Sequence, residues 1–434
     1  MTEEQRKVHE GLMAYYAAHK GGQFVPAELV QQMEPVFRET GYREPPAKGR
    51  RPHILILRDD AAGDFVLSSA FLREVRRLYP GAHITLFCSL RNEELARCCP
   101  YIDNLLVNNV SYDSQNVWEI MREVIDYVTE NFLPLHFDLA FSGRLGLRSA
   151  NLLLMYISGA LRRVGFTQDR IAEDGRVMRQ GWDMLLTVPV PVRTEPESDV
   201  DRDLFLLEYL LQLPIENRRL EVWTLAAERR AAEAAVMPLL RQKGVKRLYA
   251  IMPSTSEKFR EWPLERFEEL LRRLLQQESD LGFLIMGGPA DRALAETLAE
   301  KLPGRALALA GKLPFRVSAE AVGLCRKYIG DDTALMHIAA AKGVPVLTTF
   351  PYPASLGLTY LSCPIRFQPY GVPSVVVIPP KALGKECKAK YGTGCNVRGE
   401  HHCILGITVE KMLQGYSLLE KRIAEGSTHA LILQ

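Results

Sequence analysis

The chain has 434 residues, of which 47% are hydrophobic and 24% are charged, and its formal net charge is +2. This length exceeds one ordinary core and suits two α/β domains, and the composition is typical of a globular protein rather than a disordered one. The nearly balanced charge gives no overall field that would attract nucleic acid, so we do not expect a nucleic-acid partner.

The N-terminal segment, residues 1–51, is expected to be a helical extension followed by a linker. Four of its first seven residues are charged, where a secretion signal needs an apolar core. The longest apolar run, residues 152–157, is too short to span a bilayer. We therefore expect a cytoplasmic protein. The basic linker at residues 43–51 is interpreted as solvated, and the alternative is peripheral contact with anionic lipid of the inner membrane or with an acidic acceptor.

The first domain, expected at residues 52–220, opens with a strand at residues 53–57, in which an unbroken aliphatic run follows His53. Such a run is typical of a parallel strand buried on both faces. A helix with apolar positions from Leu67 to Leu78 and a strand at residues 83–88 complete a βαβ unit, which predicts a parallel sheet. Later strands of the same sheet are predicted at residues 137–141 and 163–166.

A second α/β alternation follows a polar connector at residues 189–201 and a helix at residues 203–212. It defines a second domain at residues 221–385, followed by a cysteine-containing loop and a helix within residues 386–434. Strands are predicted at residues 248–252, 282–286, 306–310, 328–330 and 345–350, and helices at residues 264–277, 290–301, 334–342 and 408–423. Two alternations predict two doubly wound, Rossmann-like domains that face a cleft.

The loop at residues 58–64 lies at the sheet edge where open α/β sheets bind ligands. It contains three carboxylates, Asp59, Asp60 and Asp64, and Gly63 permits close approach of another group. Taken alone, Asp64 is better explained as the N-cap of the following helix than as a residue that projects into the cleft. The other carboxylates weaken this explanation, because one or two of them have no capping role.

The turn at residues 253–263 combines hydroxyl groups with positive charge. Ser254 and Thr255 provide neutral donors, and Lys258 and Arg260 provide cations, between a predicted strand and a predicted helix. This mixture is typical of a diphosphate site, although a polar surface loop would have the same composition.

Two further turns follow strands of the second domain. The glycine-rich turn at residues 286–292 lacks the dinucleotide fingerprint and a Walker lysine, and no fingerprint follows the first strand either, which excludes a dehydrogenase. The turn at residues 330–345 begins with Asp332 and Thr333, where N–H groups of the next helix are free, and His337 lies one turn further on the same face. A histidine in this position suggests a phosphate or ribose contact.

In their order along the chain, these features resemble glycosyltransferase family 9, the bacterial heptosyltransferases. The resemblance covers residues 54–345. Its motifs are Gly63-Asp64 after the first strand, Ser254-Thr255 with Arg260-Glu-Trp-Pro263, Gly287-Gly-Pro289, Ala310-Gly-Lys312, and Asp332-Thr-Ala-Leu-Met-His-Ile-Ala-Ala340. The resemblance implies a GT-B fold and the inverting transfer of a heptose from a nucleoside diphosphate, commonly ADP, without a cofactor required for catalysis.

The resemblance also implies roles for individual residues. Asp64 would be the general base that deprotonates the acceptor hydroxyl as it attacks the anomeric carbon. Thr255 with Lys258 or Arg260 would hold the diphosphate. The other expected donor-side residues are Ser254, Gly287, Asp291, Leu313, Asp332, Thr333, Ala334 and His337, and the expected acceptor-side residues are Asp60 and Gly63.

Three departures from the family pattern concern the backbone and the acceptor side. Ala334 replaces the glycine of the family motif, and Asp60, Ala61 and Ala62 replace its small hydroxyl residues. The acidic loop would repel a phosphorylated acceptor unless basic residues elsewhere compensate.

Cysteines near the C-terminus allow two interpretations. Cys387, Cys395 and Cys403 recur every eight residues, and Cys363 would be a fourth ligand. The spacing is not a recognised zinc motif, so free thiols compete with a structural iron or zinc site. Family relatives that modify autotransporter proteins carry a cysteine-bound iron in a similar region.

The sequence therefore predicts a heptosyltransferase that uses a nucleotide-sugar donor and a lipopolysaccharide-core or similar glycan or glycolipid acceptor. A protein or natural-product acceptor is the alternative within the same chemistry. A non-catalytic nucleotide-sugar-binding protein is a third hypothesis, and the presence of Asp64 argues against it.

Overall fold

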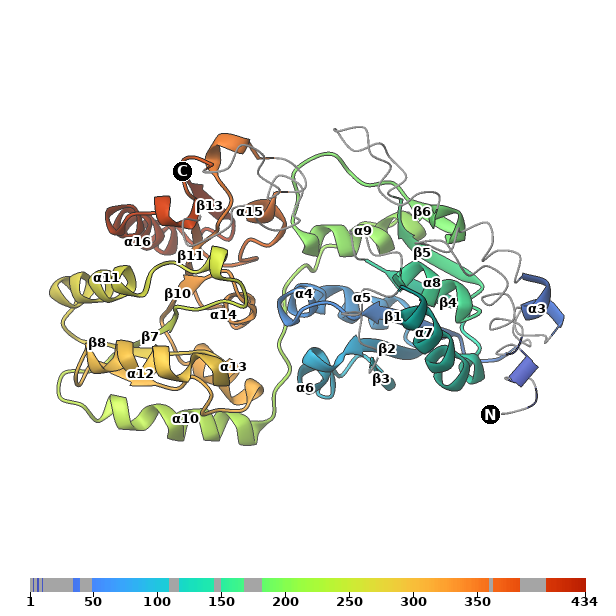
Figure 1. Ribbon diagram of the computed structural model, residues 1–434, viewed down its shortest axis with the longest axis horizontal. Coiled ribbons are helices and arrows are strands. Elements are labelled where there is room, and N and C mark those ends of the chain that lie inside the picture. Colours follow the sequence, from blue (N-terminus) through green and yellow to red (C-terminus); the bar gives the residue numbers. More distant parts are fainter. Residues whose placement is uncertain are drawn as a thin grey trace. The chain divides into compact units, whose positions relative to one another are not determined.

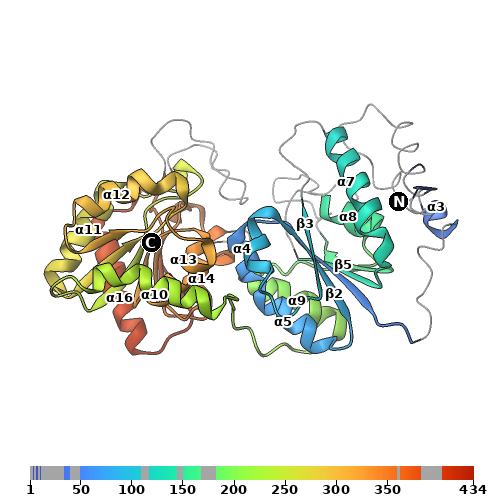
Figure 2. The same cartoon turned by 90° about the horizontal axis from the view of Figure 1, so that it is seen from below.

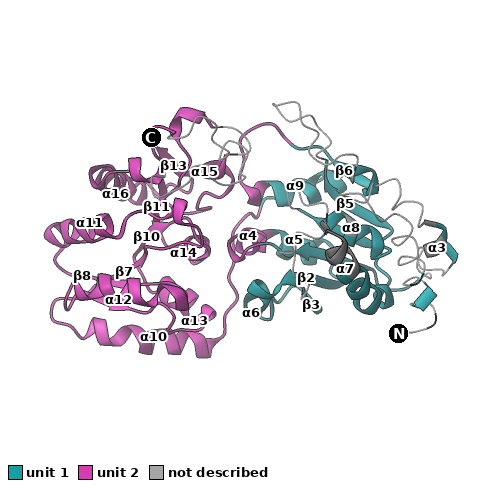
Figure 3. Ribbon diagram, viewed as in Figure 1, with its two compact units in different colours: residues 1–60, 71–192, 202–216 teal, residues 61–70, 193–201, 217–434 magenta. Residues whose placement is uncertain are grey.

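The computed structural model describes residues 3, 6–7, 10, 34–39, 49–108, 117–143, 150–167, 182–358, 362–382 and 403–434. The chain forms two α/β units (Figure 1). Unit 1 comprises residues 1–60, 71–192 and 202–216, and unit 2 comprises residues 61–70, 193–201 and 217–434 (Figure 3). The sequence analysis expected a single boundary near residue 220. In the structure, two short segments before this boundary, residues 61–70 and 193–201, also belong to unit 2. Of the expected N-terminal extension, the structure describes helix α3 (Glu34–Glu39).

Unit 1 contains a six-stranded parallel sheet with the strand order β3-β2-β1-β4-β5-β6. This order is typical of doubly wound nucleotide-binding folds. Its strands are β1 (His53–Arg58), β2 (His83–Ser89), β3 (Asn104–Asn108), β4 (Leu139–Ser142), β5 (Arg162–Phe166) and β6 (Val188–Val190), and its longer helices are α5 (Ser69–Leu78), α7 (Val117–Asn131), α8 (Ala150–Ile157) and α9 (Asp199–Leu211). The sequence analysis assigned residues 189–201 to a polar connector. This was wrong for the first two of them, which belong to strand β6.

The predicted continuous helix after β1 is wrong, because the structure has two helices there. Helix α4 (Ala62–Leu67) has Ser68 as its C-cap, and α5 begins at Ser69. The Ser68 hydroxyl donates to the Phe65 carbonyl at 2.7 Å, and the Ser69 hydroxyl donates to the carbonyl of Val66 at 2.7 Å. Such side-chain bonds compete with the helical ladder. The apolar spacing along both helices is the same as in one helix, so the break was not apparent from periodicity.

Unit 2 contains a seven-stranded parallel sheet with the order β13-β12-β11-β10-β7-β8-β9. Its strands are β7 (Arg247–Met252), β8 (Leu281–Ile285), β9 (Ala306–Ala308), β10 (Lys327–Asp331), β11 (Val346–Thr349), β12 (Ser374–Val377) and β13 (Ala430–Leu433). Its helices are α10 (Ala226–Leu240), α11 (Leu264–Gln277), α12 (Arg292–Glu300), α13 (Phe315–Gly323), α14 (Ala334–Ala341), α15 (Cys363–Arg366) and α16 (Val409–Ala424) (Figure 2). Among the described helices of the chain, none is both long and apolar enough to span a bilayer.

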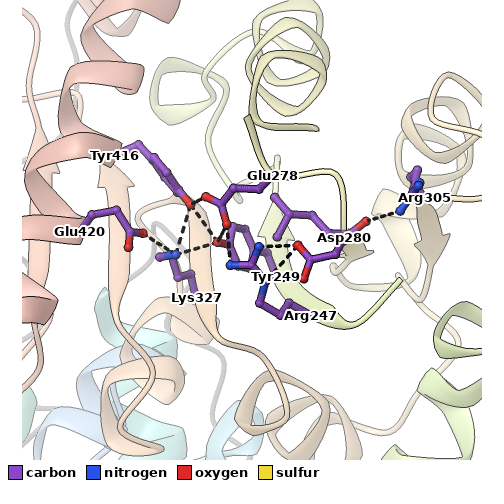
Figure 4. Close-up of polar contacts among 9 residues, drawn as sticks. Arg247, Tyr249, Glu278, Asp280, Arg305, Lys327, Tyr416 and Glu420 are labelled. Carbon is purple, nitrogen blue, oxygen red and sulfur yellow. Dashed lines mark hydrogen bonds and ion pairs between the residues drawn. The ribbon is translucent and has the colours of Figure 1, made fainter. Parts of the chain in front are cut away.

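A buried polar cluster attaches α16 to the sheet of unit 2 (Figure 4). The Lys327 ammonium, at the start of β10, donates to the Tyr249 hydroxyl at 2.6 Å and the Tyr416 hydroxyl at 3.2 Å, and it pairs with Glu420. The two tyrosine hydroxyls are 2.8 Å apart, and Tyr416 also donates to Glu278. Because the cluster lies at the amino ends of β7 and β10, it is a structural feature at the edge opposite to the ligand-binding edge.

Replacing Lys327 with alanine is expected to lower the free energy of unfolding by about 1–3 kcal/mol, because the buried hydroxyl groups of Tyr249 and Tyr416 lose their shared donor. Urea denaturation would measure this loss. Lys421→Ala in α16 is the matched control, because Lys421 is exposed and pairs only weakly with Glu425, at 3.8 Å. Equal effects of the two substitutions would show that the cluster does not stabilise α16.

Candidate active site

Asp64 lies inside helix α4 and is not its N-cap residue. The N-cap is Ala61, in an extended conformation, and it makes no side-chain capping bond. The interpretation of Asp64 as an N-cap is therefore wrong, because the helix starts two residues before it. The half-buried Asp64 carboxylate belongs to the first turn of α4, where the positive end of the helix favours a negative charge.

Helix α4 packs directly against α14 within unit 2 (Figures 1 and 2). A Cβ atom at Gly63 would lie 2.8 Å from Cδ2 of His337 and 3.6 Å from the Ala334 Cα atom. Only glycine permits this approach, so the residue before Asp64 has a packing role. The contact brings Asp64 into the neighbourhood of His337, although 273 residues separate them along the chain.

Gly63→Ala is expected to push α4 away from α14 and lower the free energy of unfolding by about 1–3 kcal/mol, with loss of activity. Thermal unfolding and a turnover assay would measure both effects. Gly81→Ala provides a matched control, because a Cβ atom there meets no atom within 4 Å. A Gly63→Ala protein as stable and active as the control would contradict the packing role.

His337 is 3% exposed, and burial lowers the pKa of its imidazole. Three carboxylates, Asp332, Asp64 and Asp199, oppose this shift, and Arg260 reinforces it. The lowered pKa makes the imidazole neutral at pH 7. Its Nδ1 atom is buried without a hydrogen-bond partner among the described residues.

Ser254, which follows β7, has a buried hydroxyl that likewise lacks a partner in the described part of the chain. Strands β7 and β10 are neighbours, so the turns that carry Ser254 and the start of α14 leave the sheet side by side. An unpaired buried polar group costs about 1–3 kcal/mol, and a ligand that supplies a partner recovers that cost. Such deficits are expected where a ligand binds.

Arg260 is held at this edge by Asp332. Its Nη2 atom donates to the Asp332 carbonyl oxygen at 3.1 Å and to the Asp332 carboxylate. The Asp332 charge raises the pKa of Arg260, and the Asp64 charge raises it further. Nε and Nη1 of Arg260 donate to no residue that the structure describes, so one edge of the guanidinium is fixed and another is available to a phosphate.

The preceding residue, Asp331, fixes this turn, and sequence analysis did not identify it. Its carboxylate accepts from the Thr349 hydroxyl at 2.6 Å and from the Trp262 backbone N–H at 3.2 Å. The Trp262 indole in turn donates to the Ile407 carbonyl at 2.8 Å. These bonds join the carboxyl ends of β10 and β11 to the Arg-Glu-Trp-Pro segment, which explains why a tryptophan follows Arg260 so closely. The sequence signal for Asp331 was its position directly before Asp332, at the end of a predicted strand.

Arg366 and Asp199 also adjoin this site, and sequence analysis identified neither. Arg366 donates from Nε and Nη2 to the two Asp199 carboxylate oxygens, each at 2.9 Å. Burial disfavours the Arg366 cation, but Asp199 outweighs burial and the pKa is raised, with a further contribution from Asp64. A lone arginine in the apolar Cys-Pro-Ile-Arg-Phe segment was the only sequence signal.

Cys363, expected as a metal ligand, lies near these arginines. Burial raises the pKa of its thiol to about 11, with Asp332 as a further cause, while Arg366 and Arg260 lower it. Cys403 is buried at the start of a short 3-10 helix, and Cys387 and Cys395 lie outside the described residues. Within the described ranges, no three His, Cys, Asp or Glu residues form a group that could hold a metal ion.

Other expected donor-side residues make mainly local contacts. Lys258 is 84% exposed at its side chain and pairs with Glu261 at 2.6 Å. The Thr255 hydroxyl donates to the Glu257 carbonyl at 2.8 Å and accepts from its N–H at 3.1 Å. The structure thus brings Arg260 into the charged cluster and leaves Lys258 at the surface.

The glycine-rich turn after β8 is closed by Asp291. Its carboxylate accepts from the Gly288 N–H at 2.7 Å, and a Cβ atom at Gly287 would lie 2.7 Å from the Asp291 Cβ. Leu313 is half-buried in the segment between β9 and α13. Thr333 is the N-cap of α14, but its side chain does not cap the helix and instead bonds to the Tyr328 hydroxyl at 3.1 Å.

Asp60 lies in unit 1, where it forms an ion pair. Its carboxylate is 3.0 Å from Arg58 Nη2, and Arg58 Nη1 donates to Asp203 at 2.9 Å. Arg58 therefore supplies a positive charge that balances the acidic loop. The sequence analysis did not identify this role of Arg58.

Comparisons with known proteins place this site in a family. Residues 137–366 match the model of glycosyltransferase family 9 (heptosyltransferase). No curated protein sequence matches the chain. A family 9 glycosyl transferase structure from Veillonella parvula has a TM-score of 0.64 at 18% identity, over 85% of this chain and 97% of its own.

Two E. coli structures show the same fold. ADP-heptose lipopolysaccharide heptosyltransferase II has a TM-score of 0.56 at 16% identity, over 86% of this chain and 99% of its own. Heptosyltransferase WaaC with ADP has a TM-score of 0.59 at 15% identity, over 85% of this chain and 99% of its own. These similarities confirm the predicted α/β fold of the GT-B type. Because the family match spans more than half of the 434 residues, the chain belongs to glycosyltransferase family 9 and is a glycosyltransferase.

Proposed function

We propose that the chain transfers a heptose from a nucleoside diphosphate heptose, with ADP as the nucleotide, to a hydroxyl group of a lipopolysaccharide-core or similar glycan. The observation that carries this proposal is the position of Asp64 in unit 2. It lies in the first turn of α4, it adjoins the neutral His337, and its charge acts on Arg260. The family supports heptose as the sugar.

Asp64 acts as the general base in this proposal. It accepts the proton of the acceptor hydroxyl while the hydroxyl oxygen forms a bond to the anomeric carbon. The bond from that carbon to the diphosphate breaks on the opposite face, and the diphosphate departs with the electron pair. The product therefore has the inverted anomeric configuration, and the transferred proton resides on Asp64.

Arg260 and the start of α14 stabilise the departing diphosphate. The free edge of Arg260 donates charge-assisted hydrogen bonds, each worth about 1.5–3 kcal/mol. Thr333 does not cap α14 with its side chain, so the first N–H groups of this eight-residue helix remain available to an anion. Adenine as the base is supported by E. coli WaaC, whose structures were solved with ADP and with ADP-2-deoxy-2-fluoro heptose.

Calorimetric titration with ADP-heptose, ADP, UDP and GDP tests the donor. We expect binding of the adenine ligands and weaker binding of UDP and GDP. Arg260→Ala or Asp332→Ala should weaken the binding. Preference for UDP or GDP would contradict the ADP-heptose assignment, and the absence of binding by any of the four ligands would contradict the proposed donor site.

A further inference from the structure

Arg366 is a buried cation with a defined orientation. It is the last residue of α15 and is 9% exposed. The bidentate pair with Asp199 uses Nε and Nη2, which fixes the plane of the guanidinium. The Phe367 ring lies 4.7 Å from the guanidinium carbon and limits its movement further. An arginine held in this way loses little conformational freedom when it binds a ligand.

One edge of Arg366 remains available. No acceptor among the described residues bonds to its Nη1 atom, which carries two N–H donors. Nη1 is also not one of the described buried atoms that lack a partner, so solvent reaches it. Arg260 has the same arrangement, with one edge held by Asp332 and the other open.

The two arginines act electrostatically on the same groups. Asp64 and Cys363 each interact electrostatically with both Arg260 and Arg366. The charges of Asp332 and Asp199, the partners of the two arginines, both act on His337. Two guanidinium groups that act on the same neighbours, each with an open edge, are suited to a ligand with two linked anionic groups.

Resting on the proposed function, we propose that Arg366 is a second donor-binding residue that contacts the diphosphate of the nucleotide sugar together with Arg260. Asp199 is its positioning residue, because it holds the guanidinium by the edge away from the ligand. Arg366 also stabilises the diphosphate as it leaves, since negative charge accumulates there when the glycosidic bond breaks.

The test compares ADP with adenosine, which lacks the phosphates, by calorimetric titration of Arg366→Gln, Arg366→Lys and wild-type protein. Arg366→Gln should weaken ADP binding by roughly 10- to 100-fold and leave adenosine binding unchanged. Arg366→Lys should give an intermediate loss, because lysine retains the charge but not the planar fork. Arg366→Lys also tests the inference if the Arg366→Gln variant does not fold.

Arg247→Gln is the matched control, because Arg247 forms a comparable bidentate pair with Asp280 at the opposite sheet edge (Figure 4). Arg247→Gln should not change the ratio of the affinity for ADP to the affinity for adenosine. Unchanged ADP binding in both Arg366 variants would overturn the inference and leave the proposed function intact. Equal weakening of ADP binding and adenosine binding would do the same. A rise in the acceptor KM alone would assign Arg366 to the acceptor instead. If wild-type protein binds no nucleoside diphosphate, the proposed function and the inference both fail.

Discussion

Asp64→Asn is expected to lower kcat by about 100- to 10,000-fold, the usual contribution of a general base. The amide has almost the same shape as the carboxylate but cannot accept the acceptor proton, so the attacking oxygen retains its hydrogen. Donor binding should persist, because Arg260 and the start of α14 hold the diphosphate. Steady-state kinetics with continuous detection of ADP release would measure kcat and the donor KM separately.

Asp59→Asn is a matched control for this substitution, because Asp59 lies in the same acidic loop and outside helix α4. It should leave kcat essentially unchanged. If Asp64→Asn retains the wild-type kcat, Asp64 is not the base. If it loses donor binding instead, the carboxylate acts in binding and not in proton transfer.

Arg260→Ala has the second largest expected effect, a rise of roughly 10- to 100-fold in the Kd for ADP and in the donor KM. The substitution removes the free donor edge and also leaves the 7% exposed Asp332 without its ion-pair partner. An unpaired carboxylate near the phosphates would add repulsion. Titration calorimetry and steady-state kinetics would provide the two constants.

Lys258→Ala distinguishes the two cations of the same turn. The sequence offered either as a diphosphate ligand, and the structure places Lys258 in solvent, paired with Glu261. We expect little change in ADP affinity for Lys258→Ala. A larger loss for Lys258→Ala than for Arg260→Ala would exchange their roles.

The parallel sheets were predictable because buried parallel strands have unbroken aliphatic sequences. The run that became β1 has this character, and those that became β2 and β7 are mostly apolar. Strand β12 and the edge strand β13 were missed, since the run at Ser374–Val377 is short and β13 follows the last helix.

The candidate site was predictable only in part. Spacing located Asp64, Arg260 and Asp332 at turns after strands, but it could not decide whether Asp64 caps its helix, because that depends on where the helix begins. The approach of Gly63 to His337 is a contact between distant segments, so no local pattern encodes it. Arg366 was missed for the same reason: its role depends on Asp199, which is 167 residues away.

The most direct test of the account is the configuration of the product. Purified protein would be incubated with ADP-heptose and a heptose-deficient lipopolysaccharide core, and the anomeric configuration of the transferred sugar would be determined by NMR for wild type and Asp64→Asn. The account predicts a product of inverted configuration, with one ADP released per sugar transferred, and almost no product from Asp64→Asn. A product that retains the donor configuration, or equal turnover by the two proteins, would contradict it.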